Sequence, residues 1–208
     1  MKRFLIPILI LSIILGASAV FILNKKSETT QIVNQDSATQ TTETENTPAN
    51  CSGKPLVEST EGPYYKTGSP RRQKITEEGT AGIHLILKGY VFDTNCKPVA
   101  NAWLDFWQAD GQGNYDNTGY NLRGYQYTDK NGFFRLETVV PGQYPGRTEH
   151  IHFKVRKSEG SPVITSQLFF PESMTNTNDS IFDKSLVVDF GTDPDGSKYA
   201  GFNIIISN

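Results

Sequence analysis

Two of the chain's three histidines stand two positions apart, in residues 149–155, which read EHIHFKV. Apolar and polar residues alternate there, which predicts a β-strand with its apolar side chains in a core and both His150 and His152 on the opposite face. Along a strand these two side chains lie about 6.6 Å apart, close enough to converge on one metal ion. The same pattern also fits a half-exposed strand whose two histidines bind no metal.

Two tyrosines precede the histidine pair in loops rich in turn-forming residues. Tyr144 lies in residues 141–147, which read PGQYPGR, and Tyr115 ends residues 107–115, which read WQADGQGNY. Loops at the ends of a rigid β-sandwich are where sites are usually built. A zinc site would recruit a third His, Cys or carboxylate, and a cupin-type site would need a glutamate soon after the pair and a histidine later than His152. Both patterns need ligands that the sequence does not obviously provide.

The segment that must position these residues, 51–208, reads as a series of short strands. β-Branched and aromatic residues gather in seven runs, and turn-forming residues separate them. No amphipathic helix of a dozen residues interrupts the series, which favours an all-β fold, an antiparallel β-sandwich with long active-site loops. The predicted strands are 84–92, 99–107, 123–128, 133–138, 150–155, 163–169 and 202–207.

Two different kinds of sequence precede this domain. Lys2 and Arg3 lead into an almost unbroken apolar run that ends at residue 23, so residues 1–23 are predicted to be a signal peptide or a membrane anchor. Residues 17–19, which read ASA, resemble a cleavage site, while about 20 apolar residues would also span a bilayer. Residues 24–50 are rich in Thr, Gln, Asn, Ser and Glu, which predicts a disordered polar linker. We therefore expect an extracytoplasmic location, with membrane contact only through an uncleaved first segment.

Net charge bears on whether the protein binds nucleic acid, and cysteine content bears on whether it has a disulfide or a cysteine metal site. The formal net charge of −2 gives no electrostatic reason to expect nucleic acid. Cys51 and Cys96 are an even count in a chain expected to be exported, which favours a disulfide between them, with two free thiols as the alternative. Neither cysteine has a Cys or His close to it in the sequence, which argues against a metal role.

The globular segment resembles the intradiol ring-cleavage dioxygenases, the family of protocatechuate 3,4-dioxygenase and catechol 1,2-dioxygenase. The matching motifs occur in the family's order and cover almost all of residues 51–208. The most specific of them is the run from Tyr144 through Arg147 to His150-x-His152. Other matching pieces are residues 60–65 (TEGPYY), 107–109 (WQA), 113–115 (GNY), 121–124 (NLRG) and 166–170 (SQLFF).

The resemblance implies a ferric ion, Fe(3+), as the cofactor and assigns roles to nine residues. They are the metal ligands Tyr115, Tyr144, His150 and His152, the catalytic residues Arg147, Tyr144 and Gln167, and the substrate-binding residues Gly62, Pro63 and Tyr64. A ferric ion can lower the pKa of a phenol from about 10, so that tyrosinate binds at neutral pH. The resemblance also implies that Tyr144 is displaced by the substrate and accepts one of its protons. His84 and Arg123 are expected to be structural, and an ordinary turn is the alternative for residues 62–64.

The resemblance implies an oxidoreductase that uses O2 to cleave a catechol-type diol between its two hydroxyl-bearing carbons, giving a cis,cis-muconate-type product. Compared with well-known members, the connection from Tyr144 to His150 is short and the long helical dimerisation region is missing, so no oligomeric state is implied. The sequence shows no evident cluster of basic residues that would bind a carboxylate group on the substrate. The substituents on the substrate ring are therefore not predicted. The alternative from another class is a non-enzymatic, transthyretin-like surface or adhesion module of similar length and strand content.

Overall fold

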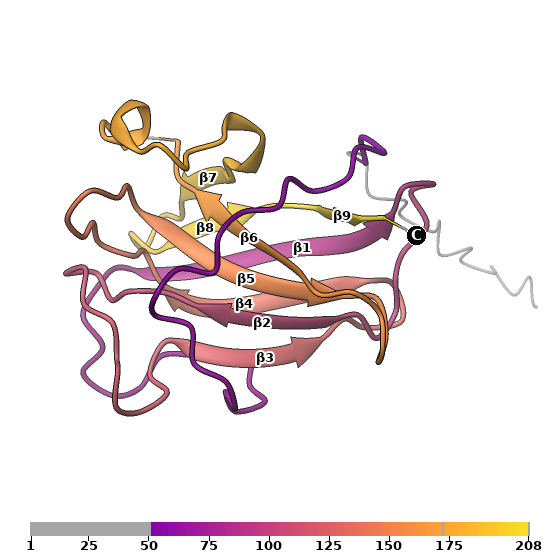
Figure 1. The fold of residues 1–208 in the computed structure, drawn as a ribbon. Coiled ribbons are helices and arrows are strands. Elements are labelled where there is room, and N and C mark those ends of the chain that lie inside the picture. Colours follow the sequence, from indigo (N-terminus) through magenta and orange to yellow (C-terminus); the bar gives the residue numbers. More distant parts are fainter. Residues whose placement is uncertain (1–50, 172, 208) are drawn as a thin grey trace, which may run out of the picture. The chain divides into compact units, whose positions relative to one another are not determined.

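The computed structural model describes residues 51–171 and 173–207, which form nine strands and two 3-10 turns (Figure 1). The expected signal or anchor at 1–23 and the expected linker at 24–50 lie outside the described residues. In the described part, no helix combines the length and the apolar character needed to cross a membrane. The elements are β1 His84–Asp93, β2 Trp103–Trp107, β3 Arg123–Tyr127, β4 Phe133–Val139, β5 His150–Arg156, β6 Ile164–Phe169, η1 Asn176–Asn178, η2 Lys184–Leu186, β7 Asp189–Thr192, β8 Lys198–Gly201 and β9 Ile204–Ile206.

The strands form two stacked sheets (Figure 1), and the apolar core lies between them. One sheet has the order β4-β1-β8-β7, with β9 paired to the far end of β1, and the other has the order β3-β2-β5-β6. Leu85 and Leu87 from the first sheet and Phe106 and Phe153 from the second are fully buried in this core. The prediction of an all-β sandwich is therefore confirmed.

The structure has two strands that the sequence did not predict, β7 and β8, and two further details differ from the expectation. Strands β8 and β9 run parallel to β1, whereas the other strand pairs are antiparallel. The strand expected to begin at residue 99 begins at Trp103, because residues 100 and 101 form a turn in which Asn101 has the left-handed φ of 56°. Neither difference changes the side of the sheet on which the histidine pair lies.

Strand β5 places the two histidines on the outer face of the second sheet. Its neighbours put Trp107 of β2 and Gln167 of β6 directly opposite His152. The segment that precedes β1 crosses this outer face, as the indigo trace in Figure 1 shows, and is tied to it by hydrogen bonds from Ser59 N to Thr165 O and from Arg72 N to Tyr125 O. Side chains on this face are therefore enclosed between the sheet and the crossing segment.

A disulfide joins Cys51 to Cys96 in the turn that follows β1. It closes a loop with a sequence separation of 45, which contributes roughly 4 kcal/mol in the chain-entropy model. We expect the Cys51→Ser/Cys96→Ser double variant to lose about 2–4 kcal/mol of unfolding free energy, measured by urea titration. Adding a reductant should shift the wild-type midpoint and leave the double variant unchanged. Equal midpoints for wild type and variant would contradict a stabilising bridge.

Candidate metal centre

The side chains of His150 and His152 converge, with their Nε2 atoms 3.1 Å apart. Both residues are buried, and His150 Nδ1 lies 2.6 Å from Thr148 O, to which it donates a hydrogen bond. With its proton on Nδ1, His150 carries the lone pair on Nε2, which faces His152 Nε2 at hydrogen-bond distance. Burial lowers the pKa of His150 to about 4 and that of His152 well below its usual value, so both imidazoles are neutral at pH 7. Neutral imidazoles with converging nitrogens are suited to hold a metal ion.

Two tyrosines complete the arrangement around the histidine pair. The Tyr144 ring lies 5.5 Å from the His150 ring and 5.7 Å from the Tyr115 ring, measured between centroids. The Tyr115 hydroxyl oxygen is buried and makes no hydrogen bond within the described residues. Burial raises the pKa of both phenols, so without a metal ion each would stay protonated at pH 7 even with Arg147 beside Tyr144. A buried polar atom without a partner is costly, which suits an oxygen that binds a metal.

The donors present fit a ferric ion. Within residues 51–171 and 173–207, no group of three or more His, Cys, Asp and Glu side chains could hold a metal. A metal at the histidine pair would therefore need other donors. The nearest candidates described above are the phenol oxygens of Tyr115 and Tyr144, whose rings lie beside the histidine pair. Two phenolate oxygens bring negative charge that stabilises an oxidised, trivalent ion, while two imidazoles complete the set without further charge.

Glycines bring the two tyrosine loops together. A Cβ atom at Gly142 would lie 2.6 Å from both Gly111 O and Gly113 N, which is closer than any side chain allows. The loop that carries Tyr144 therefore packs backbone to backbone against the loop that carries Tyr115. This close approach explains why Gly113 and Gly142 carry no side chain, and it brings the two phenol rings near each other.

Arg147 links Tyr144 to two further side chains. Its Nη1 donates to Tyr144 OH at 3.3 Å, its Nη2 to Gln167 Oε1 at 2.5 Å and its Nε to Asp179 Oδ2 at 2.9 Å. Gln167 Nε2 in turn donates to Thr60 O at 2.9 Å. The structure thus brings Arg147 and Gln167 together beside Tyr144, as the motif suggested. Asp179 was missed by sequence reasoning, because it stands in a polar stretch without a recognisable motif.

The segment expected to border the substrate lies against the same cluster. A Cβ atom at Gly62 would be 3.4 Å from His152 Cε1, and the φ of Gly62 is +71°. Tyr64 stacks on Tyr115 with ring centroids 4.3 Å apart and an interplanar angle of 14°. Pro63, between them, is exposed. Gly62 and Tyr64 therefore form part of the wall of the candidate site, and Pro63 faces solvent.

Arg123 and His84, both expected to be structural, differ in their surroundings. Arg123 is buried and donates to Tyr64 O at 2.7 Å and to Asp116 O at 3.0 Å, so it joins the two segments that carry the stacked tyrosines. His84 lies on β1 in the other sheet, with a half-exposed side chain 3.5 Å from Glu137. His84 therefore takes no part in the candidate metal centre.

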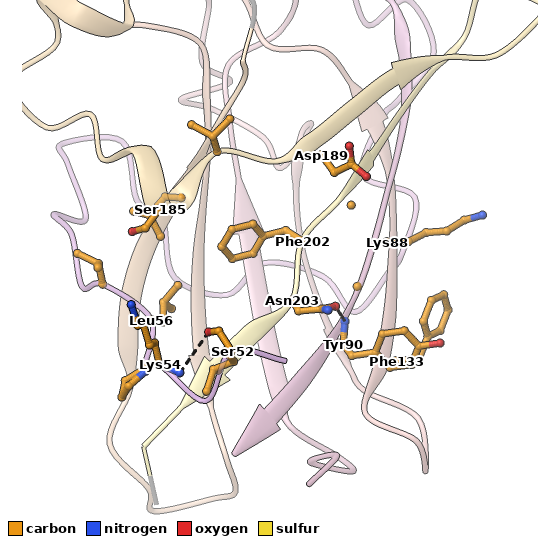
Figure 2. A pocket seen from close by; sticks show the side chains of 17 residues that line it. Ser52, Lys54, Leu56, Lys88, Tyr90, Phe133, Ser185, Asp189, Phe202 and Asn203 are labelled. Carbon is orange, nitrogen blue, oxygen red and sulfur yellow. Dashed lines mark hydrogen bonds between the residues drawn. The ribbon is translucent and has the colours of Figure 1, made fainter. Parts of the chain in front are cut away.

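One pocket of about 650 Å³ lies away from this cluster. It lies against the first sheet, lined by residues such as Lys88, Tyr90 and Phe202 (Figure 2). None of the four candidate ligands lines it. A second pocket, of about 360 Å³, is lined by Tyr144, Arg147 and seven neighbours. The chemistry of the residues, rather than the size of the pocket, identifies the functional site.

Comparison with known proteins finds related sequences that are named dioxygenases. A family model described as "Dioxygenase" matches residues 60–190, more than half of the chain. Catechol 1,2-dioxygenase from Acinetobacter baylyi is 31% identical over 137 residues, which are 52% of this chain and 44% of that protein. Hydroxyquinol 1,2-dioxygenase from a Rhizobium species is 27% identical over 158 residues, 62% of this chain and 53% of that protein. The chain spans about half the length of these curated relatives.

Solved structures share the fold along the whole sandwich. The dioxygenase domain of a dioxygenase and carbohydrate-binding protein fusion from Streptomyces sp. SirexAA-E has a TM-score of 0.71 and 43% identity, and the match covers 74% of this chain and 99% of that one. An intradiol ring-cleavage dioxygenase from Tetranychus urticae has a TM-score of 0.65 and 29% identity, with 72% and 92% covered. The chain belongs to the intradiol ring-cleavage dioxygenase family.

Proposed function

We propose that the chain is an iron(III)-dependent intradiol dioxygenase that cleaves a catechol-type aromatic diol with O2. The observation that carries this proposal is the convergence of the two buried imidazoles, 3.1 Å apart, beside the buried Tyr115 hydroxyl that has no hydrogen-bond partner among the described residues. Tyr115, Tyr144, His150 and His152 would hold Fe(3+). Family membership favours this enzyme over a non-enzymatic surface module.

A ferric ion in this site would supply the Lewis acidity and the electron transfer for the reaction of the bound diol with O2. In the overall reaction, the ring bond between the two hydroxyl-bearing carbons breaks and both atoms of O2 are incorporated. The two carbons become carboxyl groups, so the ring is oxidised and O2 is reduced. The product is a cis,cis-muconate-type diacid.

Tyr144 is suited to accept a proton from the substrate. It stands on a loop flanked by Pro and Gly, whereas His150 and His152 stand on β5, so Tyr144 can move more readily than either histidine. Its phenol oxygen accepts a hydrogen bond from Arg147 Nη1, which favours the anionic form of the phenol. Burial outweighs this contact and raises the pKa of the Tyr144 phenol, so a phenolate displaced by the diol would take up one diol proton at its oxygen.

Arg147 and Gln167 would stabilise and orient the reacting ring. The Arg147 side chain is 13% exposed, so its charge is poorly screened by water. A positioned cation in a water-poor site stabilises negative charge that develops in the transition state. Gln167 accepts from Arg147 and donates to Thr60 O, so it holds the guanidinium against the segment that carries Gly62 and Tyr64.

We also propose an extracytoplasmic location. The apolar run from residue 4 to residue 23, preceded by Lys2 and Arg3, supports export. The Cys51–Cys96 disulfide supports the same proposal, because structural disulfides persist in oxidising compartments.

We expect the iron-loaded full chain to consume O2 with catechol or hydroxyquinol faster than with protocatechuate. Arg147 is the one basic residue in the described lining of the pocket beside Tyr144, and three of its five N–H donors are bonded to Tyr144, Gln167 and Asp179. That lining offers no second cation to bind a ring carboxylate. Oxygen-electrode rates at equal substrate concentration, with mass spectrometry of the products, measure this preference.

Resorcinol is the matched control substrate, because its hydroxyls do not stand on adjacent carbons and no uptake is expected with it. A semialdehyde product from catechol would contradict intradiol cleavage. A purified chain that stays colourless and iron-free after reconstitution would instead support the surface module.

A further inference from the structure

Asp179 is a buried carboxylate in the turn that follows η1. Its side chain is 1% exposed. Oδ2 accepts hydrogen bonds from Arg147 Nε at 2.9 Å and from Thr148 N at 3.0 Å, and Oδ1 accepts one from Ile181 N at 2.9 Å. Within the described residues, none of its hydrogen bonds goes to a candidate metal ligand. Asp179 therefore contacts the candidate site through Arg147 and its neighbour in the chain.

The planar guanidinium makes the contact with Asp179 directional. Its three nitrogens each have a different side-chain partner, with Nη1 on Tyr144, Nη2 on Gln167 and Nε on Asp179. The donors of an arginine have a fixed fork geometry, so holding Nε restricts the directions in which the other two nitrogens point. A charge-assisted pair of this kind is stronger than a neutral hydrogen bond.

The segment that carries Asp179 is itself braced against the loop of Tyr144. Thr148 Oγ1 bonds to Ser173 Oγ at 2.6 Å and to Asn176 Oδ1 at 2.8 Å, and Gln143 Nε2 donates to Thr175 Oγ1 at 2.9 Å. These contacts fix the position of residues 173–179 without using Arg147. Asp179 is thus a fixed anchor for a side chain that stands on a Pro/Gly loop.

We propose that Asp179 is a positioning residue, which holds the guanidinium of Arg147 toward Tyr144 and Gln167 and thereby sets the turnover rate. This inference rests on the proposed function. It predicts that the effect of Asp179 on turnover depends on the Arg147 side chain, while its bonds from Thr148 N and Ile181 N hold the backbone.

We expect Asp179→Ala to lower kcat on the order of tenfold, because the charge-assisted hydrogen bond from Arg147 is lost. The same change also removes the acceptor of Thr148 N and Ile181 N, which Asp179→Asn retains in part. Iron content and KM should change by less than about twofold, because Asp179 touches neither a candidate ligand nor the stacked tyrosines. Asp179→Asn should lose less, since its amide oxygen can still accept from Arg147 Nε. In an Arg147→Ala background, Asp179→Ala should give no further loss of kcat. Steady-state kinetics on the iron-loaded full chain measure all four variants.

Asp183→Asn is the matched control, because Asp183 caps η2 in the same segment by accepting from Ser185 N at 2.8 Å. Its kcat should equal that of the wild type. A loss in this control as large as in Asp179→Ala would show that any damage to the segment slows turnover. A further tenfold loss in the Arg147→Ala background would show that Asp179 acts through the fold. Either result would overturn the proposal, and Asp179→Asn keeps the test open if the alanine variant does not fold.

A second measurement does not depend on activity. Phenylglyoxal modifies accessible arginines, and mass spectrometry of peptides from the full chain gives the rate for each one. Modification of Arg147 should be faster in Asp179→Ala than in the wild type, while Arg72, which pairs with Glu77, should react at an unchanged rate. An unchanged rate of phenylglyoxal modification at Arg147 would contradict the proposal that Asp179 holds its guanidinium. If the wild type shows no dioxygenase turnover and yet Arg147 reacts faster in the variant, the proposed function fails and the anchor stands.

Discussion

Replacing His150 and His152 together by alanine is expected to leave the chain without iron and without a visible absorption band. The two Nε2 atoms converge to 3.1 Å, and His150 Nδ1 bonds to Thr148 O, so both side chains are oriented before any metal arrives. Without them, only two phenols remain, and burial raises the pKa of both, so they are poor ligands at neutral pH. Iron per chain, measured by elemental analysis, and the visible spectrum report the result.

His84→Ala is the matched control for this loss. His84 is half-exposed, lies on the other sheet and pairs with Glu137, so iron and colour should stay at the wild-type level. Because two buried side chains are removed in the test variant, His150→Gln/His152→Gln is a second form that keeps more of the packing volume. A folded variant of either form that keeps stoichiometric iron and the same band would refute the ligand assignment.

The strand that carries the histidine pair could be predicted because its pattern is local. Side chains alternate along a strand with a period of two, so the apolar Ile151 and Phe153 fixed which face holds His150 and His152. In the structure, the two apolar residues lie in the core and the two imidazoles lie together on the opposite face. A period of two is a property of the backbone and needs no knowledge of the rest of the fold.

Strands β7 and β8 could not be predicted, because their sequences carry no such pattern. Asp189–Thr192 reads DFGT and Lys198–Gly201 reads KYAG, each with a single aromatic residue and a glycine. What makes them strands is pairing with each other and with β1, which lies about a hundred residues earlier in the chain. The parallel pairing of β8 with β1 was missed for the same reason.

In the candidate site, too, short sequence motifs could be recognised, whereas contacts between residues far apart in the chain could not. The motif around Tyr144 and Arg147 pointed to the loop, but the closeness of Tyr115 and Tyr144 depends on backbone packing at Gly113 and its neighbours. Asp179 lies 32 positions from its partner Arg147, in a stretch whose other polar residues look equally suitable. Only the folded chain distinguishes it from the acidic residues that follow. The roles of the ligands and of Arg147 stay predictions. The variants with the largest expected effects, the double histidine variant and Arg147→Ala, test them.

The charge of Arg147 lies beside Tyr144, where we propose that negative charge develops on a bound ring. Its three nitrogens contact Tyr144, Gln167 and Asp179, and its side chain is only 13% exposed. Alanine removes this charge and leaves Tyr144 without the donor at 3.3 Å, but it touches neither imidazole. The effect should therefore fall on the rate of the chemical step rather than on metal retention. Loss of one preorganised, poorly hydrated charge costs about 3 kcal/mol in the transition state.

Arg147→Ala is therefore expected to keep its iron and colour and to lose on the order of 100-fold in kcat, since each 1.36 kcal/mol is tenfold. Stopped-flow spectra separate the steps, first with catechol under nitrogen and then after addition of oxygen. Substrate binding should proceed under nitrogen, and the slow phase should follow the oxygen. Arg135→Ala removes an equal charge from β4, where it pairs with Glu137, and should leave turnover unchanged. Wild-type turnover in Arg147→Ala, or an equal loss in Arg135→Ala, would rule out a specific role for Arg147, because then neither its position nor its contacts with Tyr144 would govern the rate.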